Sequence, residues 1–390
     1  MTNAVILSVA RTPVATAFKG SLITTSPEKL ARHVLTAVIE RAGVEAAQID
    51  DVILAESMYG GGAVARHAAV EAGIIGAGGV ALNRHCAGSL TAVGFAAGSI
   101  LAGMDDAIIA GGVQSTSSTP KITYRDPATG EVTEGWMPPT HPDSPEAPNR
   151  DMSISVGWNT AQAAGLTREA MDAWAKRSHD RAIAAIDAGN FVAEIAPIEV
   201  TLPDGTTRLF AVDEHPRRGS TLEKLASLNP IHPEIEGFSI TAGNASGMND
   251  AAAAMLVTSE AFAAAAGKQP LAKVLGWAAT GIEPRLMGMG ALEVIRKILK
   301  RTGKSIEDVA LWEINEAFAS VPVAACKILG MSEDTVNIAG SGCSIGHPVS
   351  ASGARMIATL IYDLKRRGGG IGVAAMCAGG GQAGAVMIEV

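Results

Sequence analysis

Cysteine and aromatic residues are scarce in this chain. Its 390 residues include only four cysteines, Cys86, Cys326, Cys343 and Cys377, and aromatic residues make up 4% of the total. So few cysteines in so long a chain do not form the disulfide framework of a small secreted protein. We therefore expect free thiols in a reducing cytoplasm, where they are available for chemistry.

Basic clusters, targeting signals and ligand motifs are also missing. The net charge is −8, and without a basic cluster we expect no binding to nucleic acid. Neither "MTNAVILSVARTP" nor "AVMIEV" resembles a targeting signal, and no uninterrupted apolar stretch is expected to span a bilayer. Zinc-ligand spacings and a Gly-Lys-Ser/Thr phosphate loop are absent, so the sequence predicts no metal and no bound cofactor.

Short apolar runs and helical patterns alternate along the chain. Hydrophobic residues make up 47% and charged residues 18%, which suits a large buried core. Residues 4–10, 51–57 and 106–112 are predicted to be buried strands. Between the first two, residues 27–42 are predicted to form a helix capped by Ser26 and ended by a glycine. This alternation predicts βαβ units and a largely parallel sheet.

The pattern repeats in the last third of the chain. "RAGVEAAQIDDVILAES" resembles "RTGKSIEDVALWEINEA", and "DDAIIAGG" resembles "GVAAMCAGG". The separation is roughly 260 to 270 residues, which indicates a duplicated domain rather than a short repeat. We expect an N-terminal half over residues 1–266 and a C-terminal half over residues 267–390, related by a pseudo-twofold axis.

Residues from about 115 to 240 lie outside this repeat. They include the Pro- and Asp-rich stretch "RDPATGEVTEGWMPPTHPDSPEAPNRD" and one helical pattern, capped by Thr167 and ended by Gly189. We expect this insertion to fold over one end of the sheets and to shape a substrate site.

Four segments carry side chains suited to chemistry: "NRHCAGSL", "EINEAFA", "GSGCSIGHPVSASGAR" and "MCAGGGQAGA". Cys86 precedes a predicted helix, where a thiolate nucleophile is stabilised. His347 is aimed by flanking Gly and Pro and can accept a thiol proton. Cys377 follows a strand and can act as acid and base, and Asn315 can hold a water or an oxyanion. Each residue alone also fits an ordinary structural role, since buried cysteines and turn asparagines are common.

Together these segments resemble the thiolase family, which comprises the acetyl-CoA acetyltransferases and 3-ketoacyl-CoA thiolases. The resemblance extends from "VARTPVATAFKGSL" through "TAGNASGMNDAAAA" and "ATGIEPRLMGMGALEVIRK" to the end of the chain. It implies an α/β fold of duplicated βαβαβαββ halves in a layered α/β/α/β/α core with an inserted loop domain. The implied activity is reversible Claisen condensation of acyl-CoA with acetyl-CoA, or CoA-dependent cleavage of a 3-ketoacyl-CoA, in fatty acid metabolism.

The resemblance also implies residue roles. Cys86 would carry the acyl group as a thioester, and His347 would take its proton. Cys377 would remove a proton from the α-carbon of the second thioester. Asn315, through a water shared with His347, would stabilise one oxyanion, and the backbone N–H groups of Cys86 and Gly379 would stabilise the other.

Further implied contacts concern the ligand. Ser246 would meet the pantetheine arm, Arg217 would lie near the nucleotide end of coenzyme A, and Met287 and Phe318 would lie beside the acyl group. The implied partners are acyl-CoA and CoA, in a homodimer or homotetramer. The segment "MSISVGWNTA" departs from the usual Met-Gly-x-Thr-Ala-Glu-Asn of the family's covering loop, which bears on acyl specificity.

Two other functions fit part of the pattern. A ketoacyl-synthase-like condensing enzyme also pairs cysteine with histidine and asparagine, but decarboxylating condensation needs no second thiol such as Cys377. A non-catalytic acyl-CoA or lipid-binding protein would not need all four reactive groups.

Overall fold

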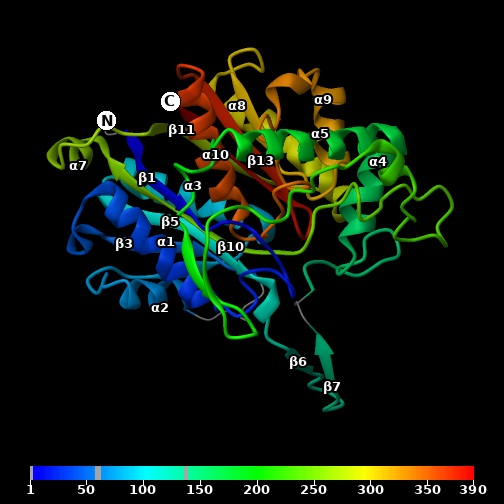
Figure 1. Cartoon of the computed structure of the whole chain (residues 1–390), viewed down its shortest axis with the longest axis horizontal. Helices are drawn as coiled ribbons and strands as arrows, with labels where there is room; N and C mark the ends of the chain where they lie inside the picture. Colours follow the sequence, from blue (N-terminus) through cyan, green and yellow to red (C-terminus); the bar gives the residue numbers. More distant parts are fainter. Residues whose placement is uncertain (1–2, 58–62, 136–138) are drawn as a thin grey trace.

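The fold is built on one long mixed sheet with helices on both faces (Figure 1). The structure is a computed structural model that describes residues 3–57, 63–135 and 139–390. One half of the sheet contains β1 (Ala4–Arg11), β2 (Ala15–Thr16), β3 (Asp51–Ala55), β4 (Val80–Leu82), β5 (Ala107–Ser115) and β10 (Asn249–Ser259). The other half contains β11 (Ala272–Gly281), β12 (Leu311–Ile314), β13 (Ile371–Ala378) and β14 (Gln382–Glu389).

The two halves of the sheet have the same strand order. One runs β3-β5-β10-β1 and the other β12-β13-β14-β11, with β4 added at the outer edge of the first. A short antiparallel pairing, Val5 with Lys273 and Ile6 with Ala272, joins β1 to β11. The shared order is the pattern expected of a duplicated unit. The predicted boundary after residue 266 falls between α7 (Glu260–Ala265) and β11.

The prediction of a largely parallel sheet is wrong. The parallel pairs are β3 with β4, β3 with β5 and β12 with β13, whereas β10 and β14 each pair antiparallel on both sides. The chain reverses between β13 and β14 at a tight turn, where Gly380 and Gly381 adopt φ values of 82° and 73° that favour glycine. Apolar runs mark buried strands, but they carry no information about strand direction.

Helices complete a five-layer arrangement around the two sheet halves. The outer layers contain α1 (Pro27–Ala42) with α2 (Val64–Glu71) on one side and α8 (Gly290–Thr302) with α9 (Ser320–Leu329) on the other. The central layer consists of α3 (Gly88–Ala102) and α10 (Ser352–Arg366), whose apolar side chains pack between the halves. The expected layered α/β fold is confirmed.

Local capping fixes the ends of two predicted helices. Ser26 accepts a hydrogen bond from the Lys29 N–H at the start of α1, and Gly43 ends the helix at φ 62°. In the same way Thr167 caps α5 (Arg168–Asp187), and Gly189 follows it at φ 71°. These boundaries agree with the predictions because caps are set by neighbouring residues.

The central helix corrects one further expectation. By length and composition, residues His85–Ala102 are apolar enough to cross a bilayer, although no such stretch was expected. In the structure 61% of this segment is buried. A helix enclosed on several sides by protein is apolar around most of its circumference, which accounts for its composition.

The insertion forms a cover of small elements. They are the hairpin β6 (Ile122–Arg125) and β7 (Val132–Gly135), a π-helical turn (Ser153–Trp158), α4 (Asn159–Ala163), α5, the hairpin β8 (Ile198–Thr201) and β9 (Thr207–Phe210), and α6 (Leu222–Ala226). Short 3₁₀ turns occur at Ala46–Gln48, His85–Ala87, Thr116–Ser118, Pro284–Met289 and Glu333–Thr335. Figure 1 shows the β6–β7 hairpin extending away from the layered core.

A buried ion-pair cluster ties the insertion to the first strand. Arg11, at the end of β1, is fully buried and donates through both terminal nitrogens to Asp213, at 2.7 and 2.8 Å. Its Nε donates to Glu194 at 2.7 Å. The fork of the guanidinium satisfies two carboxylates at once, which fixes the insertion relative to the sheet.

Candidate active site

Side chains from both halves and from the insertion line one cavity of about 340 Å³. Six residues singled out from the sequence line it: Cys86, Ser246, Phe318, His347, Cys377 and Gly379. Much of the remaining wall is apolar and is formed by Met152, Val156, Met248, Ala317 and Val349. Residues distant in the sequence therefore meet at one site, as the motifs predict.

Cys86 lies in the 3₁₀ turn just before α3 and is half-buried. The residue before it, His85, has a left-handed φ of 45°, an uncommon conformation for a residue with a side chain. Burial raises the pKa of Cys86 to about 11, while hydrogen bonds from the backbone N–H groups of Gly379 and of Cys86 itself act in the opposite direction. The thiol is therefore protonated at neutral pH and needs a base to become nucleophilic.

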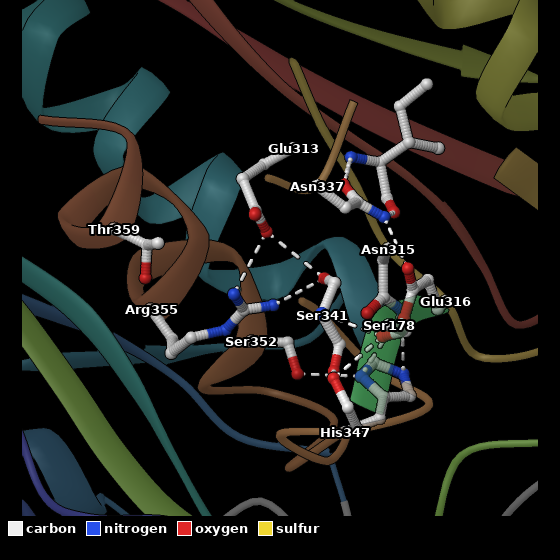
Figure 2. A network of polar contacts seen from close by, with 12 residues as sticks. Ser178, Glu313, Asn315, Glu316, Asn337, Ser341, His347, Ser352, Arg355 and Thr359 are labelled. Carbon is white, nitrogen blue, oxygen red and sulfur yellow. Dashed lines mark hydrogen bonds and ion pairs between the residues drawn. The ribbon is translucent and has the colours of Figure 1, made fainter. Parts of the chain in front are cut away.

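His347 is held as a neutral ring with a defined tautomer. Burial, and then the charge of Arg355, lowers the pKa of His347 to about 3. Its Nδ1 lies 2.7 Å from the hydroxyl of Ser352 (Figure 2). This hydroxyl donates its own proton to the Pro348 carbonyl at 3.0 Å. Because the hydroxyl has only one proton, it accepts from Nδ1–H, and this leaves the Nε2 lone pair available as a base.

The loop that carries His347 is fixed from its backbone. The His347 N–H donates to Asn249 Oδ1 at 2.9 Å, and Gly346 adopts a φ of 112°. A Cβ at Gly346 would lie 2.6 Å from Asn249, so only glycine fits this close approach. The ring is therefore aimed by the fold, as the flanking Gly and Pro predict.

Asn315 follows β12 and contacts the cavity through His347. Its Nδ2 lies 3.3 and 3.4 Å from the two ring nitrogens (Figure 2). Its Oδ1 is buried and has no hydrogen-bond partner among the described residues. A buried amide oxygen without a partner is a place where a water molecule would be stabilised.

Cys377 is the second-last residue of β13 and is 2% exposed. Burial, and then the proximity of Cys86, raises the pKa of Cys377 well above its usual range. The strand therefore presents a second protonated thiol to the cavity, next to the first. The Gly379 N–H, two residues further on, points at the Cys86 sulfur.

The four residues assigned to ligand contact are placed in two groups. Ser246 and Phe318 line the cavity, and the Ser246 N–H donates to Ala317 at 2.9 Å. Met287 is fully buried in the core beside α8 and does not line the cavity. Arg217 is exposed outside the cavity, and its backbone N–H donates to His179.

A buried polar network behind His347 was not predicted from the sequence. The Glu316 carboxylate accepts hydrogen bonds from Ser178 and Asn337 (Figure 2). It also accepts from Trp174 and from the backbone N–H of Cys343. Beside it, Arg355 pairs with Glu313 at 2.9 Å and donates to Ser341 at 2.8 Å. The available signal was the pair of glutamates in "LWEINEA", because a carboxylate at a buried strand position needs donors.

The insertion covers the cavity through its π-helical turn. Val156 of this turn and Met152, directly before it, line the cavity. Asn159 instead donates to the carbonyls of Glu146 and Arg285 at 2.7 and 2.9 Å. Trp158 packs on Phe238 with ring centroids 5.3 Å apart. The structure therefore places Asn159 and Trp158 away from the cavity lining.

No group of three or more His, Cys, Asp or Glu side chains is positioned to hold a metal ion within the described ranges. The groups that surround Cys86 in the cavity are a second thiol, one imidazole and backbone N–H groups. This set suits nucleophilic and acid–base chemistry.

Comparison with known proteins supports one family. The description "Thiolase, N-terminal domain" matches residues 4–261, and "Thiolase, C-terminal domain" matches residues 268–390. The chain is 37% identical to an acetyl-CoA acetyltransferase of Escherichia coli K12, with 100% of this chain and 99% of that protein covered. It is 36% identical to a 3-ketoacyl-CoA thiolase of Bacillus subtilis 168, with both covered completely.

A solved structure agrees with this result. The crystal structure of the Bacillus anthracis acetyl-CoA acetyltransferase is similar at a TM-score of 0.91 and 36% identity, over 100% of this chain and 99% of that one. Both the sequence and the fold are therefore shared over the full length. The chain belongs to the thiolase family.

Proposed function

We propose that this protein catalyses the reversible Claisen condensation of an acyl-CoA with acetyl-CoA, or the CoA-dependent cleavage of a 3-ketoacyl-CoA, through a thioester on Cys86. The chain is an acyltransferase, as its family and relatives indicate. The observation that carries the proposal is the meeting of two thiols and one neutral imidazole in a single cavity.

In the first step Cys86 becomes acylated. Nε2 of His347 accepts the thiol proton, and the thiolate attacks the carbonyl carbon of the acyl-CoA. The backbone N–H groups of Cys86 and Gly379 donate to the oxyanion, since both already hydrogen-bond the sulfur. The C–S bond to CoA then breaks, and the departing CoA thiolate takes the proton from His347.

In the second step Cys377 moves a carbon-bound proton. His347, neutral again after the first step, takes the thiol proton of Cys377, and the resulting thiolate removes a proton from the α-carbon of acetyl-CoA. The enolate then attacks the thioester carbonyl on Cys86. The new carbon–carbon bond forms as the Cys86 sulfur leaves, and this sulfur takes the proton held by His347. Asn315, with a water at its unpartnered Oδ1, and His347 support the enolate oxygen.

The alternatives fit the site less well. A decarboxylating condensing enzyme has no use for a second thiol at the position of Cys377. A lipid-binding protein has no use for the fixed tautomer of His347. The family models and relatives favour neither alternative.

Mass spectrometry of the protein mixed with acetyl-CoA tests the proposal directly. The peptide that contains Cys86 should gain one acetyl group, and the adduct should be lost on adding CoA. Absence of this adduct under conditions where acetyl-CoA binds would exclude the covalent mechanism.

We further propose that acyl-CoA and CoA are the only small-molecule partners, without a bound cofactor, and that the cytoplasmic chain forms a homodimer or homotetramer. Apolar side chains that stand exposed support an assembly, among them Val80 on the edge strand β4 and Phe95 on α3, both 46% exposed. Light scattering on the purified protein measures the assembly, and a monomer would contradict it.

A further inference from the structure

One charged side chain lines the cavity. Among the described lining residues, Arg150 is the only one with a permanent charge, and it lies near the apolar Met152 and Val156 of the covering segment. A cation at the rim of an apolar acyl site does not assist the chemistry of Cys86. It is suited to recognise an anion on the ligand.

The guanidinium of Arg150 has no partner in the part of the chain that the structure describes. Three carboxylates on neighbouring segments are already engaged: Asp151 with His232 at 2.7 Å, Asp143 with the Asn149 N–H at 2.6 Å, and Glu134 with Lys121 at 3.7 Å. An arginine that makes no internal pair keeps all its donors available for a ligand.

The position of Arg150 places it on the covering side of the cavity. Its Nη2 would lie 2.9 Å from a Cβ at Gly135, at the end of β7. The preceding residue, Asn149, accepts a hydrogen bond from Thr140, and Thr140 packs against Gly380, next to Gly379 in the reactive centre. Arg150 is therefore an exposed side chain on the covering side of the cavity, with its guanidinium beside the end of β7.

The ligand contacts assigned to the CoA arm belong to a different wall. Ser246 and Gly247 lie on the loop before β10, and a Cβ at Gly247 would lie 2.4 Å from the ring of His215. His215 is two residues from Arg217, which was assigned to the nucleotide end. The residues assigned to the CoA arm and Arg150 thus come from separate segments of the cavity wall.

We propose that the acyl substrate carries a carboxylate at its far end, which Arg150 binds. The substrate class is then an ω-carboxyacyl-CoA, or in the cleavage direction a 3-keto dicarboxylic acid bound to CoA at one end. This inference rests on the proposed function and deepens it. The methylene chain packs on Met152, Val156 and Val349, and the planar guanidinium pairs with the carboxylate through two hydrogen bonds.

A CoA phosphate offers the same anionic chemistry, so the test separates the two sources. We would measure kcat/KM for the cleavage of 3-ketoacyl-CoA pairs of equal carbon number, with and without a terminal carboxylate, over a series of lengths. The carboxylated member should be preferred by about 10-fold at the best length, the value of one charge-assisted contact.

Two substitutions locate the effect. Arg150→Gln should lower kcat/KM about 10-fold more for the carboxylated member than for the neutral one, and Arg150→Lys should restore part of the preference. Arg125→Gln is the matched control, because Arg125 lies on β6, the strand paired with β7, and does not line the cavity. It should leave the ratio unchanged.

Three outcomes would overturn the inference. Equal cleavage of both series by the native protein removes the preference that it requires. If Arg150→Gln lowers kcat/KM equally for the carboxylated and the neutral substrates, Arg150 contacts the CoA part of the substrate instead. Failure to cleave any 3-ketoacyl-CoA overturns the proposed function itself, and this inference with it.

Discussion

The two central helices begin in equivalent places of the duplicated fold but in different surroundings. In the N-terminal half, Cys86 precedes α3 in a short strained turn, and its sulfur is contacted by backbone N–H groups. In the C-terminal half, His347 precedes α10 and is held by side chains, first by Ser352 and then by the network around Glu316. The helix ends also touch, since Ser89 accepts a hydrogen bond from the Ala354 N–H at 3.0 Å.

This difference separates two requirements of nucleophilic catalysis. The substrate must be able to reach the nucleophile, so the nucleophile is surrounded by small residues and backbone N–H groups. A base must keep one orientation and one tautomer, so it is enclosed by a satisfied polar network. One duplicated framework provides both environments.

The largest expected effect comes from exchanging the two thiols for alanine. Cys86→Ala should abolish the acetyl adduct and lower condensation about 10⁴-fold or more. Cys377→Ala should still form the adduct on Cys86, but condensation should fall about 10³-fold, as expected for a lost general base. Mass spectrometry and steady-state assays measure the two steps separately. Full condensation by Cys377→Ala would show that the roles of the thiols are wrongly divided.

Substitution of the two buried arginines, Arg11 and Arg355, tests the comparison through the free energy of unfolding. Arg11→Gln leaves the carboxylates of Asp213 and Glu194 without their cation, and should cost about 3–5 kcal/mol in free energy of unfolding. Arg355→Gln should cost less, roughly 1–3 kcal/mol, because burial raises the pKa of Glu313 to about 8 and its carboxyl can remain protonated.

Urea unfolding at neutral pH measures both values. An exposed pair provides the control, since Arg296→Gln next to Glu293 should change stability by less than about 1 kcal/mol. A larger cost for Arg355→Gln than for Arg11→Gln would show that Glu313 is charged in the folded protein.

The pH dependence of stability should differ between the two histidines that flank the reaction centre. The folded pKa of His347 is about 3, below the unfolded value of about 6.5, so the unfolded chain binds the extra proton as pH falls. Stability is therefore lost below pH 6.5, by roughly 3 kcal/mol at pH 4 from this residue alone. His347→Gln should flatten the slope more than His85→Gln, as measured by urea unfolding from pH 7 to pH 4. Equal slopes would contradict the deeper burial of His347.

Of the catalytic substitutions, those at Ser352 should show the smallest effect. Ser352→Ala frees the ring of His347 to take either tautomer, so kcat should fall about 10- to 100-fold with little change in KM. Ser352→Thr keeps a hydroxyl and should restore most of the rate. A loss that threonine does not rescue would point to packing at the start of α10 instead.

Sequence reasoning succeeded where the determinants are local. Ser26, Pro27 and Gly43 set both ends of α1 without reference to the rest of the fold. The meeting of Cys86 and His347 followed from the repeat, because equivalent helices in a duplicated unit pack together. Motif order and spacing were therefore sufficient to place the reactive groups.

Long-range features were not accessible in the same way. Strand direction was misjudged because a buried strand has the same apolar pattern in either orientation. The role of Ser352 was missed because a serine at a helix start is normally a cap, and Arg150 lies in a Pro-rich segment without periodicity. Met287 shares its apolar character with core residues, and the structure places it in the core.

The π-helical turn at Ser153–Trp158 has a consequence for how substrate range diverges. One residue added to or removed from a helix rotates all following side chains by about 100°. A π turn absorbs such a change locally, without breaking the helix. Insertion or deletion of one residue there would change which side chains line the cavity beside Met152 and Val156. Cys86, His347 and Cys377 would stay in place. Substrate range can thus diverge between relatives while the catalytic residues stay the same.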